Sequence, residues 1–390
     1  MDRAPELRTI ARVSGSALIA NVRRLAELLP GQSLIAMVKA DAYGHGAGWA
    51  GRLLLKERSV SSFGVATISE GIELRRELGA RGARVPILVF SGATPWPRGS
   101  RGDELGKACH FHGLTPVIAS IEDWRSFHSG FPRKSWSVRI PFELKFNTGM
   151  NRLGIGLEHL GEIRRDLLRL SQIGVFPGGI FSHLAVGEDA THPVSRLQAA
   201  RFEALCSELS AILPDSVDFH LANSAAVLGA KKWKFLARAR RARPGLALYG
   251  IAPEGARRDH GLTPVLTLEA PVILLHELAP GESVGYGGRY ITRKKERVAV
   301  LGLGYAEGVH RSFGQPGSGA RALLRGRLEP FVGPFSMDLC SVRASRAVRR
   351  GDWARLWGEG IDPYRQAAAA NTIPYEFLTS LTRRVQRIHG

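Results

Sequence analysis

The sequence predicts an α/β protein, in which a TIM-type (β/α)8 barrel is followed by a smaller, predominantly β domain. Over the first two-thirds of the 390 residues, eight short apolar runs alternate with longer amphipathic stretches. After about Pro253 the pattern changes to short alternating runs between Gly and Pro turns, which is typical of antiparallel strands. The length also exceeds what one typical core supports, so two domains are expected.

Each predicted barrel strand is a short apolar run, and the eight cover residues 34–38, 63–66, 86–90, 115–119, 138–146, 174–182, 217–221 and 242–249. Helices are expected between several of them, for example over residues 69–78, 159–171 and 195–213. A barrel of this kind carries its chemistry at the carboxyl ends of the strands. Lys39, Lys145, His183 and the pair Asn223-Ser224 meet this requirement. Arg243 is the exception, because it lies early in the eighth predicted strand, and that strand is expected to start later.

The barrel domain is expected over residues 1–253 and the β-rich domain over residues 254–390. Residues 254–263 are predicted to form a loop at the junction, and the strand-like residues 7–13 fit either domain. The remaining predictions for the second domain are strands over residues 272–275, 297–303, 321–324, 339–342 and 353–356, and helical segments over residues 363–371 and 374–381.

Composition excludes several classes of protein. No apolar segment has the length of a membrane span, and the early acidic residue Asp2 does not suit a signal peptide, so a cytoplasmic protein is expected. The three cysteines, Cys109, Cys206 and Cys340, are odd in number and widely spaced, which favours reduced thiols over a disulfide framework. The segment Cys109-His110-Phe111-His112 lacks a second ligand pair at suitable spacing, so no metal is expected.

The formal charge of +19 has two interpretations. Basic runs such as residues 231–234 and 238–243 are compatible with nucleic acid binding. The alternative is a solvated basic surface. Because no zinc finger, basic zipper or RNA-binding aromatic signature accompanies the charge, we expect the second interpretation and no nucleic acid partner.

Residues 34–46 carry the most specific chemical signal. Lys39 follows an apolar run directly, and desolvation lowers the pKa of an amine, so that its neutral form can make a Schiff base with an aldehyde. Tyr43 offers a hydroxyl, and Gly44-His45-Gly46 lets the chain turn into a helix whose N-terminus suits a phosphate. A nucleophilic lysine beside a phosphate site is what pyridoxal phosphate requires. A lone strand-end lysine, in contrast, more often simply reaches solvent.

Residues 38–46 strongly resemble the cofactor-lysine motif of the alanine racemase family, which uses pyridoxal 5'-phosphate. Further segments match the same family in the same order, and together they cover nearly the whole chain: residues 178–183, 222–225, 243–250, 285–287, 302–308, 336–338 and 372–376.

The resemblance implies a two-base mechanism. Racemisation removes the α-hydrogen from one face of the substrate and returns it to the other, so an acid/base is needed on each face. One base is assigned to Lys39 and the other to Tyr286, supplied by the neighbouring subunit of a homodimer. A phenol is a poor base at neutral pH, and His183 is implied as the neighbour that eases deprotonation of Tyr286.

The resemblance also implies the cofactor contacts. Arg243 would face the pyridine nitrogen and leave it unprotonated, because an arginine does not readily give up a proton. Asn223 and Ser224 share one matching segment. The groups assigned to the phosphate are hydroxyls and main-chain amides, from Tyr43, Ser224, Gly245, Leu246 and Tyr375.

Substrate contacts are implied for Arg152 and for the main-chain amide of Met337, with Tyr305 and Tyr375 narrowing the entrance. Asp338 lies in the same segment as Met337 and is expected to support it. A narrow entrance favours alanine over larger substrates.

Lys145 resembles a lysine that is carbamylated in many members of the family and then orients Arg152. Two departures from the family pattern bear on this modification. Asn147 stands where many members carry an aspartate, and Asn151 replaces a usually small residue. A third departure is Ser336, at a position that is often cysteine, and little effect is expected from it.

The expected function is the interconversion of L-alanine and D-alanine, with D-alanine supplied for peptidoglycan. The alternatives are a racemase of broader specificity or one acting on serine or lysine, a decarboxylase of the related barrel group, and a non-catalytic pyridoxal phosphate carrier. Tyr286 opposite Lys39 favours racemisation, and carriers usually lack a second domain. The expected partners are the small-molecule substrate and a second copy of the chain, without a membrane.

Overall fold

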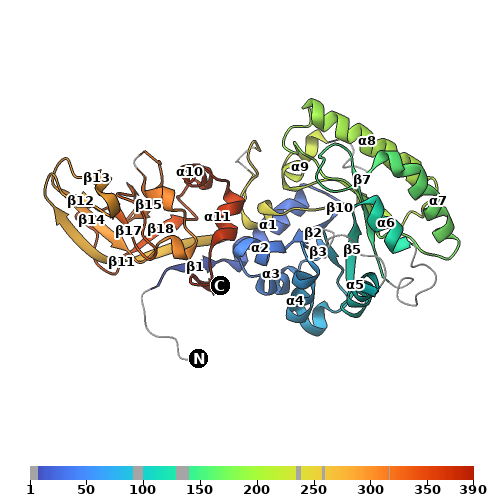
Figure 1. The fold of residues 1–390 in the computed structure, drawn as a ribbon, viewed down its shortest axis with the longest axis horizontal. Helices are drawn as coiled ribbons and strands as arrows, with labels where there is room; N and C mark the ends of the chain where they lie inside the picture. Colours follow the sequence, from blue (N-terminus) through green and yellow to red (C-terminus); the bar gives the residue numbers. More distant parts are fainter. Residues whose placement is uncertain (1–7, 91–99, 129–139, 234–238, 257–259, 316) are drawn as a thin grey trace.

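The computed structural model describes residues 8–90, 100–128, 140–233, 239–256, 260–315 and 317–390. Two bodies stand side by side in it (Figure 1). The barrel, drawn in blue to yellow, occupies one end of the molecule, and an orange to red sheet domain occupies the other. Helices α1 (Gly15–Glu27), α2 (Lys39–Gly44) and α11 (Pro374–Ser380) lie where the two bodies meet.

Eight parallel strands of the described chain form the barrel, in the order β10-β2-β3-β4-β5-β6-β8-β9. A parallel bridge between Asn223 and Arg243 brings the two ends of this order together. The predicted barrel is therefore confirmed. The strands are β2 (Ser33–Met37), β3 (Val60–Val65), β4 (Ile87–Val89), β5 (Leu114–Ile118), β6 (Glu143–Asn147), β8 (Gly179–Phe181), β9 (Asp218–His220) and β10 (Arg241–Ala242), with β7 (Ile155–Gly156) paired beside β6.

The hydrophobic pattern explains the barrel. Leu34 to Met37 of β2 are all buried, as expected for a parallel strand that is covered on both faces. On α7 (Leu160–Ser171) the buried residues Ile163, Leu167 and Leu170 follow helical spacing and face inward. The other barrel helices are α3 (Ala47–Leu54), α4 (Ile68–Leu78), α5 (Ser100–Phe111), α6 (Ile121–His128), α8 (Pro193–Ser210) and α9 (Ser224–Leu228).

The second domain is built around the long strand β11 (Leu266–Leu278), which pairs antiparallel with β1, β14 and β18. Strand β1 (Ile10–Val13) thus joins this sheet, where β19 also pairs with it in parallel. The remaining elements are β12 (Ser283–Val284), β13 (Tyr290–Ile291), β14 (Glu296–Leu301), β15 (Arg321–Leu324), β16 (Arg327–Pro330), β17 (Cys340–Arg343), β18 (Trp353–Trp357), β19 (Gln386–His389) and the helix α10 (Pro363–Ala369).

The eighth strand differs from the prediction of residues 242–249. Strand β10 ends at Ala242, and a 3-10 helix, η5 (Leu246–Tyr249), follows. Pro244 cannot donate to a strand ladder, and the sequence Pro244-Gly245 turns the chain out of it. The strand therefore starts earlier than expected, and Arg243 directly follows it, like the other candidate site residues.

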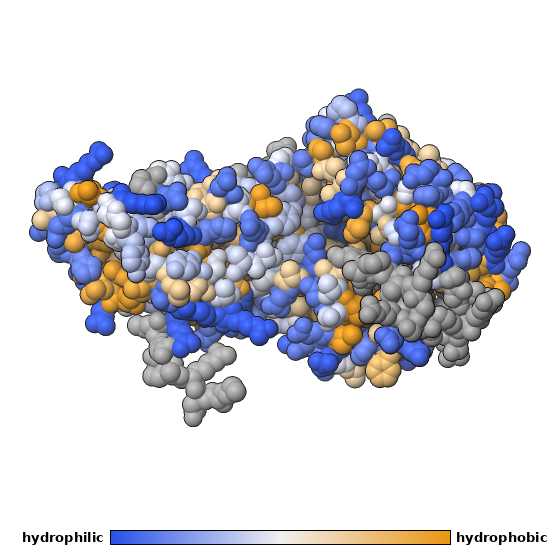
Figure 2. Space-filling model, viewed as in Figure 1, coloured by the Kyte–Doolittle hydropathy of each residue, from blue (hydrophilic) through white to orange (hydrophobic). Residues whose placement is uncertain are grey.

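The thiols, the helices and one face of the surface can also be described. Cys109, Cys206 and Cys340 are all free thiols. Within the described ranges, no helix is long and apolar enough to cross a membrane, and no group of three or more metal-ligating side chains occurs. The face shown in Figure 2 is largely hydrophilic, with smaller hydrophobic groups at one edge of the sheet domain and over the barrel.

Candidate active site

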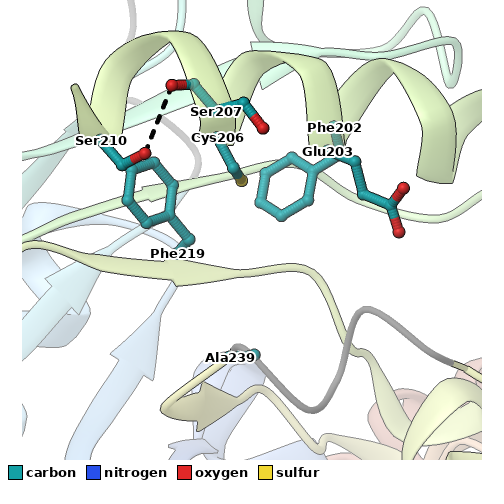
Figure 3. Close-up of a pocket in the computed structure, with 7 residues that line it drawn as sticks. All are labelled: Phe202, Glu203, Cys206, Ser207, Ser210, Phe219 and Ala239. Atoms are coloured by element: carbon teal, nitrogen blue, oxygen red, sulfur yellow. Dashed lines mark hydrogen bonds between the residues drawn. The ribbon is translucent and has the colours of Figure 1, made fainter.

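A cavity under helix α8 is the first candidate site, but few of its lining side chains could take part in a reaction. It has a volume of about 130 Å³ and lies between α8 and β9 (Figure 3). Its described lining is Phe202, Glu203, Cys206, Ser207, Ser210, Phe219 and Ala239. Glu203 is the single charged side chain of this described lining. Several buried groups with perturbed pKa values, among them Lys39, Lys145 and His183, lie elsewhere, at the carboxyl ends of the barrel strands.

Lys39 occupies the predicted position, two residues after β2. Burial lowers the pKa of its amine, the positive charge of Arg152 lowers it further, and Glu70 opposes the shift. A lowered pKa increases the fraction of neutral amine, which is the nucleophilic form.

The chain after Lys39 makes a left-handed turn. Four consecutive non-glycine residues, Ala40 to Tyr43, have φ between 51° and 54°. For L-residues this conformation costs roughly 1–2 kcal/mol per residue, so the surroundings must hold it. Such strain next to a reactive lysine is typical of functional sites.

Polar contacts hold the two ends of this turn. Glu70 accepts a hydrogen bond from the amide of Ala40 at 2.8 Å, and Asp41 accepts one from the amide of Ala47 at 2.7 Å. Inside the turn, the Nδ1 atom of the buried His45 donates to the carbonyls of Ala42 and Tyr43, each at 2.9 Å. Three of these contacts fix backbone groups of the strained residues, and the fourth ties the side chain of Asp41 to the start of α3.

Because His45 is buried, we expect the folded protein to lose stability in acid. Burial, with smaller contributions from Arg387 and His389, lowers its pKa to about 4, against 6.5 for an exposed histidine. The unfolded chain therefore takes up this proton first, and stability falls as the pH drops from about 6.5 towards 4. The full pKa shift corresponds to a loss of about 3 kcal/mol in the free energy of unfolding.

The measurement is the free energy of unfolding of the apoprotein in guanidinium chloride between pH 7 and pH 4. The variant His45→Gln lacks the titrating group, so its stability should fall less steeply, by up to about 1.4 kcal/mol per pH unit. Equal slopes for the two proteins would contradict this role of His45.

A cradle of hydroxyls and amides forms beside the turn. Ser224 Oγ accepts hydrogen bonds from the amides of Gly245 at 2.8 Å and Ala247 at 3.3 Å. A Cβ at Gly245 would lie 2.3 Å from the hydroxyl of Tyr43, so a side chain there would close the cradle. The ring of Tyr375, carried by α11, lies 6.2 Å from that of Tyr43. Leu246 begins η5 at the same place.

The predicted phosphate position at the helix after Gly46 stays a prediction. The first amide of α3, that of Ala47, donates to Asp41. Hydroxyls and amides also gather around Ser224 and Gly245, where the amide of Gly245 likewise has an acceptor, Ser224 Oγ. Asn223 lies next to them, where its side chain accepts from the amide of Ala226 and caps α9.

A group of cations surrounds Lys39. Burial and the charges of Arg152, Arg243 and Lys39 lower the pKa of Lys145 to about 8. Burial and the same cations, together with Lys145, lower the pKa of His183 well below its usual range, so its imidazole is neutral. Mutual repulsion among these groups favours an anionic ligand between them. Carbamylation of Lys145, which the lowered pKa would assist, stays a prediction.

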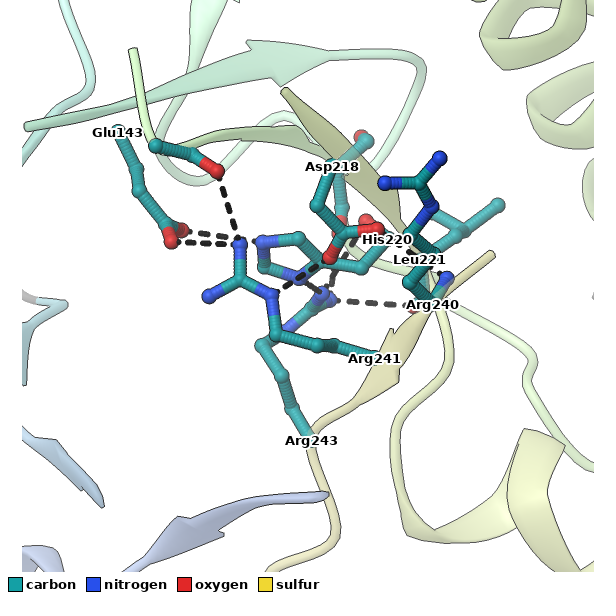
Figure 4. Close-up of polar contacts among 9 residues, drawn as sticks. Glu143, Asp218, His220, Leu221, Arg240, Arg241 and Arg243 are labelled. Atoms are coloured by element: carbon teal, nitrogen blue, oxygen red, sulfur yellow. Dashed lines mark hydrogen bonds and ion pairs between the residues drawn. The ribbon is translucent and has the colours of Figure 1, made fainter. Parts of the chain in front are cut away.

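Buried acceptors fix the side chain of Arg243 (Figure 4). It donates to the carbonyl of Ser182 at 2.6 Å, to the carbonyls of His220 and Leu221 at 3.1 Å each, and to Nδ1 of His220. Burial lowers its pKa to about 9, which still leaves the guanidinium charged at neutral pH.

His220 and Glu143 extend this network, and the sequence reasoning missed both. Because Nδ1 of His220 accepts from Arg243, its Nε2 carries the proton and donates to Glu143 at 3.0 Å. Glu143 also pairs with Arg241 at 2.9 Å, and Arg241 pairs with Asp218 at 2.6 Å. The sequence did contain a signal for this network. Asp218 and His220 are polar residues within a strand predicted to be buried, and buried polar groups need partners.

The loop that carries Arg152 is held by two asparagines. Asn147 Oδ1 accepts from the amides of Gly149 and Asn151 at 3.1 Å each, and its Nδ2 donates to Asn151 Oδ1 at 2.9 Å. Asn151 has a φ of 57°, which asparagine tolerates well. The two departures noted in the sequence thus form one hydrogen-bonded unit, and an ionised aspartate at position 147 could not donate to Asn151.

The remaining candidate residues lie in the second domain. Tyr286 lines a cavity of about 370 Å³ together with Ser336 and Leu339. The amides of Tyr305 and Ala306 donate to the carbonyls of Ser336 and Met337, at 3.1 and 2.9 Å. These contacts bring the segments that carry Tyr286, Tyr305 and Met337 together.

Asp338 has a defined partner in this region. Arg384 bridges it to Glu307, with 2.8 Å contacts to both carboxylates. In contrast, the side chains of Tyr286, Tyr305 and Met337 are 71%, 42% and 52% exposed.

The described residues fit pyridoxal phosphate. Lys39 supplies a nucleophilic amine, the glycine cradle with its hydroxyls suits a phosphate, and Arg243 is held by buried acceptors close enough for its charge to act on Lys145 and His183. Fold and site together define the class of barrel enzymes that hold a carbonyl cofactor through a lysine.

The family follows from comparison with known proteins. The model of the alanine racemase N-terminal domain matches residues 13–253, and that of the alanine racemase C-terminal domain matches residues 265–389. The chain belongs to the alanine racemase family.

Similar proteins share the whole length of the chain. An alanine racemase of Symbiobacterium thermophilum is 34% identical over 98% of this chain and 97% of its own. The crystal structure of the biosynthetic alanine racemase from Pseudomonas aeruginosa has a TM-score of 0.82 and 31% identity, covering 99% of this chain and 100% of that one. The alanine racemase structure from Bartonella henselae, with covalently bound pyridoxal phosphate, has a TM-score of 0.82 and 29% identity over the same shares.

Proposed function

We propose that this protein is a pyridoxal phosphate-dependent alanine racemase that interconverts L-alanine and D-alanine and supplies D-alanine for peptidoglycan. The observation that carries this proposal is the pairing of a low-pKa Lys39 with a glycine-built anion cradle at one end of the barrel. Membership of the alanine racemase family over the full chain supports the reaction.

Lys39 would hold the cofactor and then act as the acid/base on one face of the substrate. When bound, pyridoxal phosphate would withdraw electrons from the substrate Cα. Tyr43, Ser224, Gly245, Leu246 and Tyr375 would hold its phosphate, with Asn223 beside them. Arg243, a permanent donor backed by neutral His220, would leave the ring nitrogen unprotonated, which limits side reactions of the activated substrate.

Arg152 and the amide of Met337 would bind the substrate carboxylate, because both are donors suited to an anion. Lys145 would orient Arg152, and Asp338 would steady the segment of Met337 through Arg384. Tyr305 would narrow the entrance together with Tyr375.

Tyr286 would act on the other face of the substrate from a second copy of the chain. It lies in the connection between β12 and β13, and Figure 1 shows this hairpin at the end of the sheet domain far from the barrel. A tyrosine there cannot approach Lys39 of its own chain. A homodimer with shared sites would cover the exposed Tyr286, Tyr305 and Met337 and would bring His183 of one subunit to Tyr286 of the other.

The three free cysteines support a reducing compartment and therefore the cytoplasm. We assign residues 1–253 to the barrel domain, apart from β1, which pairs in the sheet of the second domain, and residues 254–390 to the domain that completes the partner's site.

The test is chiral chromatography after the cofactor-loaded protein has been incubated separately with L-alanine, L-serine and L-lysine. We expect D-alanine to be the dominant product. Preferential inversion of serine or lysine would keep the mechanism and reassign the substrate. Release of carbon dioxide without any D-amino acid would replace the proposal with a decarboxylase, and cofactor binding without turnover would replace it with a carrier.

A further inference from the structure

Strand β19 of the sheet domain lies against the left-handed turn that follows Lys39. Arg387 Nε donates to the carbonyl of Gly44 at 3.2 Å. His389 Nε2 lies 3.0 Å from the carbonyl of His45, and because a carbonyl only accepts, Nε2 is the donor. Two consecutive carbonyls at the end of the turn therefore bind side chains of one distant strand.

The imidazole of His389 is held on two sides. It stacks on Trp49 of α3, with ring centroids 4.6 Å apart and planes inclined by 25°. A Cβ at Gly46 would lie 3.0 Å from its Nε2, so the ring packs directly on the backbone of Gly46. This packing directs the donor towards the carbonyl of His45.

The strand that carries His389 is anchored outside the barrel. It pairs in parallel with β1, with Val13 opposite His389. The amide of Gly390 donates to Val13 at 3.0 Å, and the carbonyl of Gly390 accepts from the amide of Gly15 at 2.7 Å. The position of His389 is therefore set by the sheet domain and by the start of α1, independently of the turn.

The turn needs contacts of this kind. Its four left-handed residues are unfavourable alone, and Glu70 and Asp41 bind amides near its two ends. The donors from β19 act on the carbonyls that follow. The amide of Ala42 donates to Val38 at 2.8 Å, so the turn is also tied to the residue before Lys39. A shift of the turn would move the lysine.

We propose that His389 is a positioning residue for Lys39, which holds the left-handed turn from the sheet domain and thereby increases the affinity for the cofactor. The inference rests on the proposed function in one respect, namely that Lys39 carries the cofactor. The claim that His389 holds the turn applies to the apoprotein and does not depend on the proposed function.

Three variants separate the donor from the rest of the strand. His389→Phe keeps a ring for Trp49 and removes the donor, whereas His389→Gln keeps a donor. Ile388→Ala is the matched control, because Ile388 is the preceding residue of β19 and points to the other face. If the phenylalanine ring prevents folding, His389→Ala removes the donor with less steric demand and has the same expected outcome.

Two measurements are made on each protein. The first is hydrogen exchange of the peptide covering residues 39–47 in the apoprotein, and the second is the dissociation constant for pyridoxal phosphate. We expect His389→Phe to speed exchange in this peptide and to weaken cofactor binding about fivefold, as for the loss of one hydrogen bond. His389→Gln and Ile388→Ala should stay close to the unchanged protein.

Unchanged exchange and unchanged affinity in His389→Phe would overturn the inference. So would equal effects of His389→Phe and Ile388→Ala, because they would indicate a general weakening of the strand. If the unchanged protein itself fails to bind pyridoxal phosphate, the proposed function fails, and the exchange rates of the apoprotein alone decide whether His389 holds the turn.

Discussion

Replacing Lys39 by alanine is expected to abolish racemisation, with a loss of at least about a thousandfold, because both the cofactor link and one acid/base are removed. The visible absorption of cofactor bound through the lysine should disappear as well. The protein should still fold, because the variant removes a partly buried amine from a group of like charges.

The measurements are the absorption spectrum with added pyridoxal phosphate, the rate of D-alanine formation and the thermal midpoint. Lys56→Ala is the control, since Lys56 is an exposed lysine just beyond α3. A visible band that persists in Lys39→Ala, at the intensity of the unchanged protein, would show that another lysine carries the cofactor.

Replacing Tyr286 by phenylalanine is expected to slow racemisation by a factor of about 10²–10⁴, the usual contribution of one general acid/base. Cofactor binding and thermal stability should be unaffected, because the variant removes a single hydroxyl from a side chain that is 71% exposed. With Lys39 intact, the variant should still exchange the α-hydrogen of one enantiomer for deuterium in heavy water, without inversion.

Ile291→Ala is the control, because Ile291 is an exposed residue of the same β12–β13 hairpin. Inversion at the normal rate in Tyr286→Phe would remove the tyrosine from the mechanism. Loss of exchange for both enantiomers would assign Tyr286 a role in both proton transfers.

Mixed subunits test whether the two bases come from different chains. A heterodimer of Lys39→Ala and Tyr286→Phe subunits has one site with both native residues and one site with neither. Random mixing of equal amounts should restore at most about a quarter of the unchanged activity. Confirmed heterodimers without any recovery would place both bases in one chain.

The barrel could be predicted because its signals are local. Apolar runs such as residues 34–38 mark buried strands, and the eight runs alternate with helical patterns. The place of β1 could not be decided, since its pairing with β11 and β19 depends on residues far along the chain. The extent of the eighth strand was wrong because the turn chemistry of Pro244-Gly245 was taken as part of a strand.

Site residues could be predicted where they belong to a sequence motif. They could not be predicted where the interaction arises only from packing in the folded protein. Lys39, Ser224 and Arg243 were predicted as site residues through their segments. The neutral state of His220, its bond to Glu143 and the left-handed turn after Lys39 depend on tertiary contacts that a linear pattern does not contain. The joint role of Asn147 and Asn151 likewise became visible only in their hydrogen bonds.

The pairing of β1 with β11 and β19 also constrains how the protein can fold during synthesis. Ile10 pairs with Glu269 on one side and with Gln386 on the other, so β1 leaves the ribosome long before either partner exists. The barrel strands lie between β1 and β11 in the chain, so they can associate with one another while β1 is still unpaired. The sheet domain is therefore completed last, and the turn beside Lys39 receives its contacts from β19 only at that final stage.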